Sequence, residues 1–402
     1  MPPPLRILFY SGSIGLGHVT RDLAIAGSLR ELSPGVEIEW LASSPARELL
    51  AEAGEHLHSE TGNLADATEA ARPFMRPATF NITRWAVAVR KRWAADGRLV
   101  LSVIAGGGYD AFIGDEAYEV AMALTGGASH PGCPCFILYD FLGLDRMTLH
   151  PVEWIGVEAI NRAWARDPGG HYQAVFLGEL DDLPLSPFGR RGVSRRIWAE
   201  RNTAIVGHAL AFDPRNLPER ARLRATLGYG SEPLLLVSVG GTAAGRELIE
   251  RCFEAFPLVR KELPDIHMVV VTGPQLALTK RNLPRDVDIL SYVPRLYEHF
   301  AACDLAIVQG GNATTLELTA LQRPFLFFPL RVHCEQMKHV AARQKRLGAG
   351  VQLSIDGTSA TDLSRHVLSA LSREVHYPPL SFDGARETAQ LVLGAVVEGA
   401  TG

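Results

Sequence analysis

The sequence predicts an α/β protein with two doubly wound domains. Short apolar runs such as RILFY and LLLVSV are typical of buried parallel strands, and segments with apolar residues at helical spacing follow them. This alternation of strand and helix occurs in both halves of a chain that, at 402 residues, is long for one domain. Pro214 and Pro218 punctuate the middle. We therefore expect one domain at residues 1–208, a second at 209–380, and a final amphipathic helix at 381–402.

The composition excludes several classes of protein. Hydrophobic residues make up 47% of the chain and the formal net charge is −4, which gives no support for a nucleic-acid partner. The five cysteines form neither a disulfide framework nor a usual zinc-binding spacing. No apolar run approaches the roughly 18 to 20 residues of a membrane-spanning helix, and the N-terminus lacks a signal-peptide pattern. We expect a cytoplasmic protein with reduced cysteines.

A glycine-rich loop from Gly12 to Gly17 joins the first strand to the first helix. Its glycines follow G-x-x-G-x-G, not the dinucleotide-binding G-x-G-x-x-G, and the next strand ends without an acid to hold a ribose. NAD or FAD binding is therefore not favoured. His18 stands where the loop meets the helix. It is either a helix-start residue bonded to backbone or, because the glycines leave space beside the imidazole, a base for a substrate proton.

Asp115 follows the strand DAFIG, at the edge where α/β sheets place working groups. Its alternative role is to cap the helix that begins near Ala117. Asp140 and Asp145 come after the next strand, where solvated loop acids are common, and GRRGVSRRIW is expected to be a surface loop.

The stretch from Val308 to Gln336 carries the clearest ligand-binding pattern. After the buried strand LAIV, two glycines allow a tight turn and polar residues begin a helix. The free N–H groups and the dipole at such a turn suit a phosphate. A proline-ended strand, FLFFP, and an acid–glutamine pair follow. The strand EPLLLVSV ends in a second glycine turn, which is either an ordinary loop or a second phosphate-binding turn.

Together, GSIGLGH, VGGT and the segment Gln309–Gln336 resemble the GT-B UDP-glycosyltransferase superfamily, including the bacterial peptidoglycan N-acetylglucosaminyltransferase family. The resemblance implies two Rossmann-like domains that face each other across a cleft, with the C-terminal helix crossing back to the first. It implies transfer of a sugar, with inversion, from a nucleoside-diphosphate sugar to an acceptor hydroxyl. UDP is favoured over TDP. The donor is a co-substrate, so no cofactor is expected, and because no D-x-D group lies near the donor motif we expect no metal.

The resemblance also implies roles for single residues. His18 takes the acceptor proton, and Asp115 orients it, with Glu116 as the alternative carboxylate. Glu317 binds the ribose, Thr314 and Thr315 the diphosphate, and Glu335 with Gln336 the sugar. The predicted donor-binding residues are Gly15, Gly17, Gly240, Gly241, Thr242, Val293, Gln309, Gly310, Gly311, Asn312, Thr314, Thr315, Glu317, Glu335 and Gln336. Many relatives have a histidine where this chain has Gln309, so the phosphate contact there differs.

Acceptor choice should lie between Glu60 and Gly108, where the resemblance is loosest. Trp85, Val89 and Trp93 share one face of a predicted helix beside several basic residues. This helix either packs on its domain or receives a small-molecule or lipid-linked acceptor through peripheral membrane contact at Trp85–Trp93, on the inner face of the membrane. Two other functions remain open: a nucleotide-sugar epimerase of the same architecture, and a non-catalytic nucleotide-sugar-binding partner.

Overall fold

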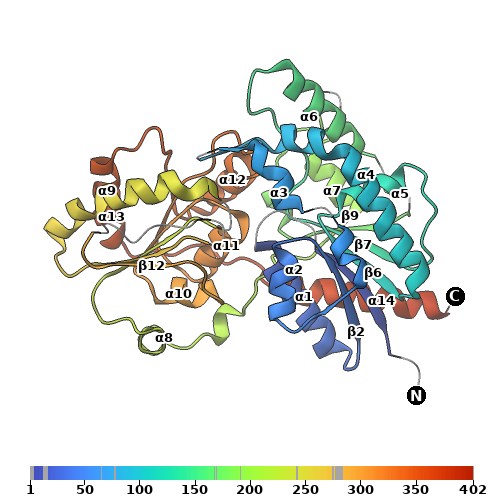
Figure 1. The fold of residues 1–402 in the computed structure, drawn as a ribbon, viewed down its shortest axis with the longest axis horizontal. Helices are drawn as coiled ribbons and strands as arrows, with labels where there is room; N and C mark the ends of the chain where they lie inside the picture. Colours follow the sequence, from blue (N-terminus) through green and yellow to red (C-terminus); the bar gives the residue numbers. More distant parts are fainter. Residues whose placement is uncertain are drawn as a thin grey trace. The chain divides into compact units, whose positions relative to one another are not determined.

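The computed structural model describes residues 4–11, 17–64, 66–76, 78–166, 168, 170–190, 192–240, 243–273, 276 and 284–401. The chain divides into two compact units (Figure 1). Unit 1 comprises Met1–Phe74, Ile82–Ala211 and Leu380–Gly402, and unit 2 comprises Met75–Asn81 and Phe212–Pro379. Each unit is an α/β domain with its own parallel sheet, as the sequence predicts.

Unit 1 contains a sheet of seven parallel strands in the order β3-β2-β1-β6-β7-β8-β9. The strands are β1 (Arg6–Ser11), β2 (Glu37–Ala42), β3 (His56–Leu57), β6 (Ala111–Asp115), β7 (Cys135–Tyr139), β8 (Gln173–Phe176) and β9 (Thr203–Ile205). The helices are α1 (Gly17–Leu32), α2 (Ala46–Glu52), α3 (Ala67–Ala71), α4 (Ile82–Gly107), α5 (Tyr118–Thr125), α6 (Pro151–Trp164), α7 (Arg195–Asn202) and α14 (Gly384–Thr401), with short 3₁₀ turns at η1 (Ser59–Asn63), η2 (Arg72–Phe74) and η3 (Leu180–Asp182).

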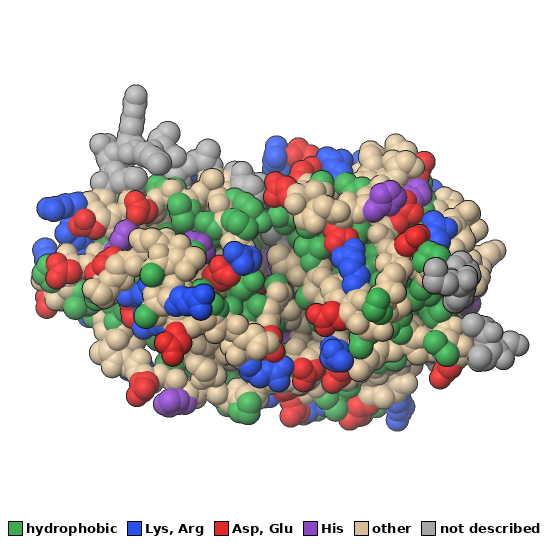
Figure 2. Space-filling view, turned by 90° about the horizontal axis from the view of Figure 1, so that it is seen from below, with side chains coloured by type: hydrophobic (Ala, Val, Ile, Leu, Met, Phe, Trp, Pro, Cys, Tyr) green, Lys and Arg blue, Asp and Glu red, His purple; other side chains and the backbone are tan. Residues whose placement is uncertain are grey.

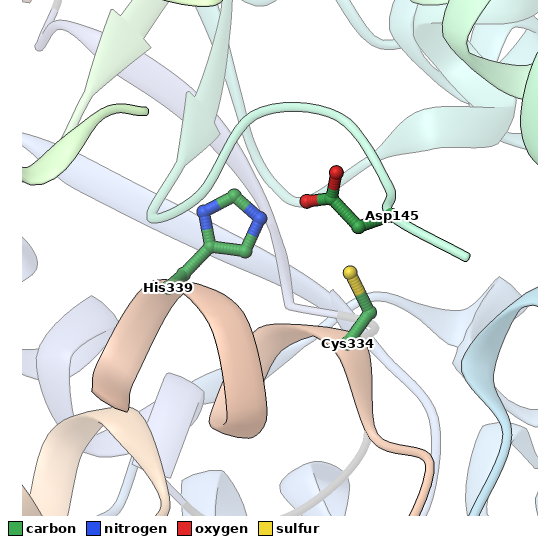
Figure 3. A group of neighbouring side chains, drawn as sticks. All are labelled: Asp145, Cys334 and His339. Atoms are coloured by element: carbon green, nitrogen blue, oxygen red, sulfur yellow. The ribbon is translucent and has the colours of Figure 1, made fainter. Parts of the chain in front are cut away.

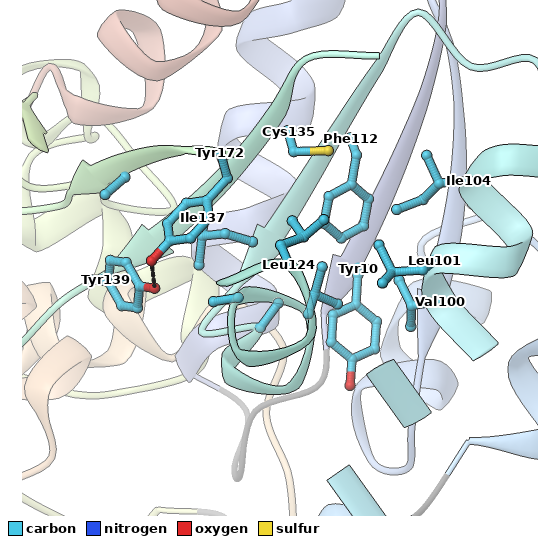
Figure 4. Packing of buried hydrophobic residues seen from close by; sticks show 14 of the residues in the cluster. Tyr10, Val100, Leu101, Ile104, Phe112, Leu124, Cys135, Ile137, Tyr139 and Tyr172 are labelled. Atoms are coloured by element: carbon cyan, nitrogen blue, oxygen red, sulfur yellow. Dashed lines mark hydrogen bonds between the residues drawn. The ribbon is translucent and has the colours of Figure 1, made fainter. Parts of the chain in front are cut away.

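Strand β1 lies at the switch point of this sheet, because it pairs with β2 on one side and with β6 on the other. Alternate β1 residues face two cores. Leu8 and Tyr10 join the core shown in Figure 4, whereas Ile7 and Phe9 join the opposite one. Connections leave a switch point in opposite directions, which opens a crevice at the carboxyl edge of the strands. That crevice is where a ligand is expected.

The last helix, α14, belongs to unit 1 and lies beside α1 (Figure 1). Its Ala389 and Val392 are fully buried in the same core as Phe9. The expected return of the C-terminal helix to the first domain is therefore present.

Unit 2 contains a sheet of six parallel strands in the order β12-β11-β10-β13-β14-β15. The strands are β10 (Leu234–Ser238), β11 (His267–Val271), β12 (Val287–Leu290), β13 (Leu305–Val308), β14 (Phe325–Phe327) and β15 (Val351–Gln352). The helices are α8 (Arg220–Leu227), α9 (Arg246–Glu262), α10 (Leu296–Ala302), α11 (Asn312–Ala320), α12 (Ala341–Leu347) and α13 (Ala360–Leu371), with 3₁₀ turns η4 (Pro214–Asn216) and η5 (Ala243–Gly245) and a π-helix, η6 (Glu335–Val340). The switch point lies between β10 and β13, which are the two strands that end in glycine turns.

A hairpin from the first half of the chain belongs to unit 2. Strands β4 (Met75–Arg76) and β5 (Thr79–Phe80) pair with each other, and the N–H of Ala78 donates to the carbonyl oxygen of Ala244 at 2.9 Å. The N–H of Arg331 donates to the carbonyl oxygen of Ala78 at 2.7 Å. The phenyl ring of Phe80 lies 5.3 Å from the ring of His333. Residues 75–81 are thus an exception to the expected assignment of residues 1–208 to one domain.

One local expectation is wrong in part. The last four residues of GRRGVSRRIW, from Arg195 to Trp198, are helical in α7, because Trp198 packs against Phe188 and the buried Arg195 forms an ion pair with Asp145 at 2.8 Å. Of the two alternatives for the tryptophan-bearing helix α4, packing on its own domain is favoured at Trp85, which is buried at 8% exposure and packs edge-on against the half-buried Trp93. No helix in the described ranges has the length and apolarity to cross a bilayer.

Candidate active site

The crevice of unit 1 holds the pair that the sequence predicts. His18 is the second residue of α1, and Asp115 is the last residue of β6, directly beside the end of β1. Nδ1 of His18 lies 2.9 Å from Oδ2 of Asp115. A carboxylate that accepts from Nδ1–H selects the imidazole tautomer whose lone pair is on Nε2. In this tautomer Nε2 can act as a general base. Gly17 begins the helix, and Gly15 lies outside the described residues.

Arg21, which the sequence analysis did not single out, completes this pair. It lies one helical turn after His18, is 7% exposed, and donates to Oδ1 of Asp115 and, at 2.7 Å, to Oδ2 of Asp140. Its NH2 group also lies 2.7 Å from Nδ1 of His18. Asp140 is therefore not a solvated loop acid. The three-residue spacing on α1 was the available signal, since such residues share one helix face.

Burial and charge act in opposite directions on the acids of this cluster. Burial alone would raise the pKa of Asp115, but the Arg21 guanidinium and His18 outweigh it and lower that pKa. Burial raises the pKa of Glu116 well above its usual range, and the neighbouring Asp140 raises it further. Burial also raises the pKa of Asp22, helped by Asp115. Asp115 is thus the carboxylate held ionised next to the histidine, which favours it over Glu116 as the partner.

His18, Glu116 and Asp140 each offer a ligand atom, and these atoms lie within 4.8 Å of one another. Arg21 already supplies positive charge to Asp140, and a second cation would be repelled there. We interpret the cluster as a proton-transfer network and not as a metal site.

In unit 2, the turn after β13 has the backbone that the two glycines predict. Gly310 has φ = +79°, a conformation that favours glycine, and a Cβ at that position would lie a tight 3.3 Å from the Phe327 ring. Gly311 is extended and precedes α11, whose first intrahelical bond runs from the N–H of Thr315 to Gly311. The N–H groups of Asn312, Ala313 and Thr314 precede that bond and point out of the helix start, as an anion site requires.

Thr315 has a different position from the one expected of a phosphate ligand. It is fully buried, and its hydroxyl lies 3.0 Å from the carbonyl oxygens of Gly311 and Asn312, so it shapes the turn. Arg343 of α12 donates to the same hydroxyl at 3.3 Å and is only 4% exposed. A buried cation therefore lies behind the first turn of α11, and the residue before Gly310 is the neutral, buried Gln309.

The acid–glutamine pair begins the π-helix η6, an arrangement frequent at functional sites. The side-chain oxygen of Gln336 accepts from the N–H of Leu330 at 2.8 Å, which fixes the orientation of its amide NH₂. Cys334 and His339, on either side of the pair, are both buried (Figure 3). Burial lowers the pKa of the adjacent His333 to about 4, so this imidazole is neutral.

The remaining predicted residues fall at other edges of unit 2. Glu317 lies in the second turn of α11, and burial raises its pKa to about 8. Val293 is half-buried in the loop after β12. Gly240 is exposed after β10 with φ = +73°, at the switch point next to the β13 turn. Gly241 and Thr242 lie outside the described residues.

Comparison with known proteins agrees with this geometry. Residues 235–378 match the glycosyltransferase family 28 C-terminal domain. The chain is 30% identical over 132 residues to a UDP-N-acetylglucosamine–N-acetylmuramyl-(pentapeptide) pyrophosphoryl-undecaprenol N-acetylglucosamine transferase of Carboxydothermus hydrogenoformans. These aligned residues cover 32% of this chain and 35% of that relative. The aligned part is thus about a third of the length of that relative.

Solved structures match over the full chain. The glycosyltransferase SnogD of Streptomyces nogalater superposes with a TM-score of 0.60 at 18% identity, covering 98% of this chain and all of that one. The Acinetobacter baumannii protein MurG superposes with a TM-score of 0.55 at 15% identity, covering 99% of this chain and 100% of that one. The predicted fold and family resemblance are confirmed: two Rossmann-like parallel-sheet domains in the GT-B arrangement of elements.

Proposed function

We propose that this chain, a GT-B protein with a glycosyltransferase family 28 C-terminal domain at residues 235–378, transfers a sugar from a UDP-sugar to an acceptor hydroxyl. The observation that carries the proposal is the 2.9 Å pairing of His18 with Asp115 in the crevice of unit 1. A histidine–carboxylate pair supplies a base, and the helix start after Gly311 supplies an anion site. The base serves an alcohol acceptor, and the anion site serves a diphosphate leaving group.

The proposed step is a single displacement. Nε2 of His18 takes the proton of the acceptor hydroxyl, and the oxygen lone pair forms a bond to the anomeric carbon. The bond from that carbon to the diphosphate oxygen breaks, and its electron pair leaves with the nucleoside diphosphate. Attack opposite the leaving group inverts the anomeric centre. Backbone N–H groups at the start of α11, with the buried Arg343 behind them, stabilise the negative charge on the diphosphate.

We propose further that this charge stabilisation replaces a metal ion. The described donor turn presents backbone groups and not a pair of acids, which suits an anion directly. A chelator should therefore leave the rate unchanged. Loss of activity with EDTA, restored by Mg²⁺ or Mn²⁺, would count against this part of the proposal.

The decisive experiment compares donor turnover by the wild type, His18→Ala and a control, His56→Ala, which removes an exposed histidine of the same unit. A thermal-shift screen of nucleotide sugars identifies the donor, because a ligand at a hundred times its Kd stabilises the fold by about 2.7 kcal/mol. We expect His18→Ala to bind donor normally and to lose turnover by about 10²- to 10⁴-fold. Donor binding with no transfer or hydrolysis by the wild type would indicate a binding partner, and an altered nucleotide sugar formed without acceptor would indicate an epimerase. The fold does not separate these classes.

We propose that the acceptor is lipid-linked and that unit 1 meets an anionic membrane through α6 and not through Trp85–Trp93. Val152, Trp154 and Ile155 on the first turns of α6 are exposed, Ile155 by 68%. Arg146 and Arg190 lie over the Trp154 ring at 5.7 and 5.5 Å. Arg190 belongs to a segment, residues 184 to 198, that contains four arginines and no acid, and of these Arg195 is buried against Asp145. Apolar side chains ringed by arginine fit an anionic lipid surface.

Elsewhere the surface charges are mixed. On the face shown in Figure 2, Lys and Arg side chains are interspersed with Asp and Glu. That pattern does not form the basic stripe that a nucleic-acid partner would need on this face.

A further inference from the structure

The side chain of Arg21 contacts His18, Asp115 and Asp140. All three contacts affect the proton that His18 can carry. NH1 donates to Asp140 at 2.7 Å, and NH2 donates to Asp115 and lies 2.7 Å from Nδ1 of His18. Each of these groups comes from unit 1: His18 and Arg21 from α1, Asp115 from the end of β6, and Asp140 from just after β7. The guanidinium therefore bridges three elements of the crevice.

Asp115 and Arg21 act on the imidazole in opposite ways. Nδ1 can donate to Asp115, or it can accept from Arg21, but it cannot do both in one tautomer. Donation to Asp115 leaves the lone pair on Nε2, and Arg21 then binds the other oxygen of the same carboxylate. A protonated imidazole would place a second cation within 2.7 Å of the guanidinium, which is unfavourable in a buried site.

We propose that Arg21 is a positioning residue for the transfer: it holds the Asp115 carboxylate against Nδ1 of His18 and opposes charge on the imidazole, so that Nε2 is ready for the acceptor proton. The inference rests on the proposed function, because positioning His18 matters only if His18 is the base. The titration that tests the inference does not require sugar transfer. The inference explains why an arginine lies beside a base: a carboxylate alone would favour the imidazolium form, and the neighbouring guanidinium opposes it.

Other titratable groups also lie around His18. Glu116 lies 3.9 Å from Nε2, and burial with the neighbouring Asp140 raises its pKa well above the usual range, which disfavours its charged form. Burial likewise raises the pKa of Asp22 on α1. Residues 12–16, GSIGL, contain no titratable side chain. Asp115, Asp140 and Arg21 are therefore the charges that set the protonation of His18.

The test is an NMR titration of His18, whose signal is identified as the one that His18→Gln removes. In Arg21→Met the midpoint should move to higher pH by about one pH unit or more, because a like charge has been removed. Arg30→Met is the matched control, since it removes an exposed arginine of the same helix that pairs with Glu55. It should not move the midpoint. The acidic limb of kcat/KM should move with the midpoint in Arg21→Met, and Arg21→Lys, which keeps the charge, should restore it in part.

An unchanged His18 midpoint in a folded Arg21→Met protein would overturn the inference, whether or not the enzyme transfers a sugar. If Arg21→Met does not fold, Asp140→Asn carries the test. Loss of that carboxylate leaves the Arg21 charge less compensated, so the midpoint should move to lower pH, and no movement would overturn the inference. A normal titration with no turnover by the wild type on any donor would instead refute the proposed function.

Discussion

The proposed ribose contact predicts a pH dependence of donor affinity that can be worked out from Glu317. Burial raises the pKa of this carboxyl to about 8. A ribose diol donates two hydrogen bonds best to an ionised carboxylate, so the ionised form is the one that binds tightly. From that pKa, the ionised fraction is about 9% at pH 7 and about 76% at pH 8.5. The Kd of UDP should therefore fall about eightfold over this range, which corresponds to about 1.2 kcal/mol.

The sign follows from linkage. The nucleotide binds the form that has lost its proton, so binding releases a proton below pH 8 and affinity rises with pH. Calorimetry of UDP binding at pH 7, 7.5, 8 and 8.5 measures both the affinity and, from buffers of different ionisation enthalpy, the released proton. Glu317→Gln should bind more weakly at pH 8.5 and lose the pH dependence, because the amide does not titrate.

A second ligand separates this effect from ionisation of the nucleotide itself. 2′-Deoxy-UDP lacks one hydroxyl of the diol and should show a smaller difference between the wild type and Glu317→Gln. Equal slopes of affinity against pH in the wild type and Glu317→Gln would refute the reasoning, because they would mean that Glu317 does not contact the ribose.

Three further predictions concern stability and membrane contact. Phe80→Ala, which empties a buried position of the hairpin beside His333, should lower the free energy of unfolding of unit 2 by about 3 kcal/mol in urea titrations. Burial lowers the pKa of His333 to about 4, so as pH falls the unfolded chain binds a proton at His333 before the folded chain does. Stability should therefore fall as pH drops from about 6.5 to 4. His333→Phe should flatten that dependence, and an equal fall in both proteins would refute it. Ile155→Glu should lower co-sedimentation with phosphatidylglycerol vesicles at least about fivefold, whereas Met122→Glu, at an exposed position on α5, should not; equal binding by both variants would remove the α6 surface from the proposal.

The sequence predicts the elements well where one strand is wholly apolar and a glycine turn follows. LAIV became β13 and the turn at Gly310 has the positive φ that glycine permits. Period and turn chemistry are local properties, so they can be derived from neighbouring residues. Asp115 was placed at the end of its strand by the same reasoning, and its contact with His18 follows from the order of parallel strands.

What the sequence did not show depends on partners far along the chain. Residues 75–81 have no strong strand pattern of their own, and they form a hairpin in unit 2 because Ala244 and Arg331 supply backbone partners. GRRGVSRRIW looks like a solvated loop by composition, but Asp145, 50 residues away, pairs with Arg195 and buries it. The resemblance implies that Thr315 binds the diphosphate, and the sequence alone does not show that its hydroxyl already donates to backbone carbonyl oxygens of Gly311 and Asn312. In each case the deciding contact is between residues with no local signature.

The two units show how one topology supports two chemistries. Both sheets have their switch point at the strand that comes first in the sequence of that sheet, β1 in unit 1 and β10 in unit 2. In unit 1 the carboxyl edge of the sheet holds titratable groups, His18 with Asp115 and Arg21, and there the Arg21 guanidinium and His18 lower the pKa of Asp115 whereas burial raises the pKa of Glu116. In unit 2 the described turn after β13 presents Gln309, two glycines and backbone N–H groups, none of which titrates. A proton acceptor must change charge during the reaction, whereas a diphosphate site must not, because it has to stabilise the same anion throughout. If the proposed function holds, unit 1 takes the acceptor and unit 2 the donor. The acidic limb of the rate profile should then belong to unit 1, even though donor affinity has its own pH dependence through Glu317.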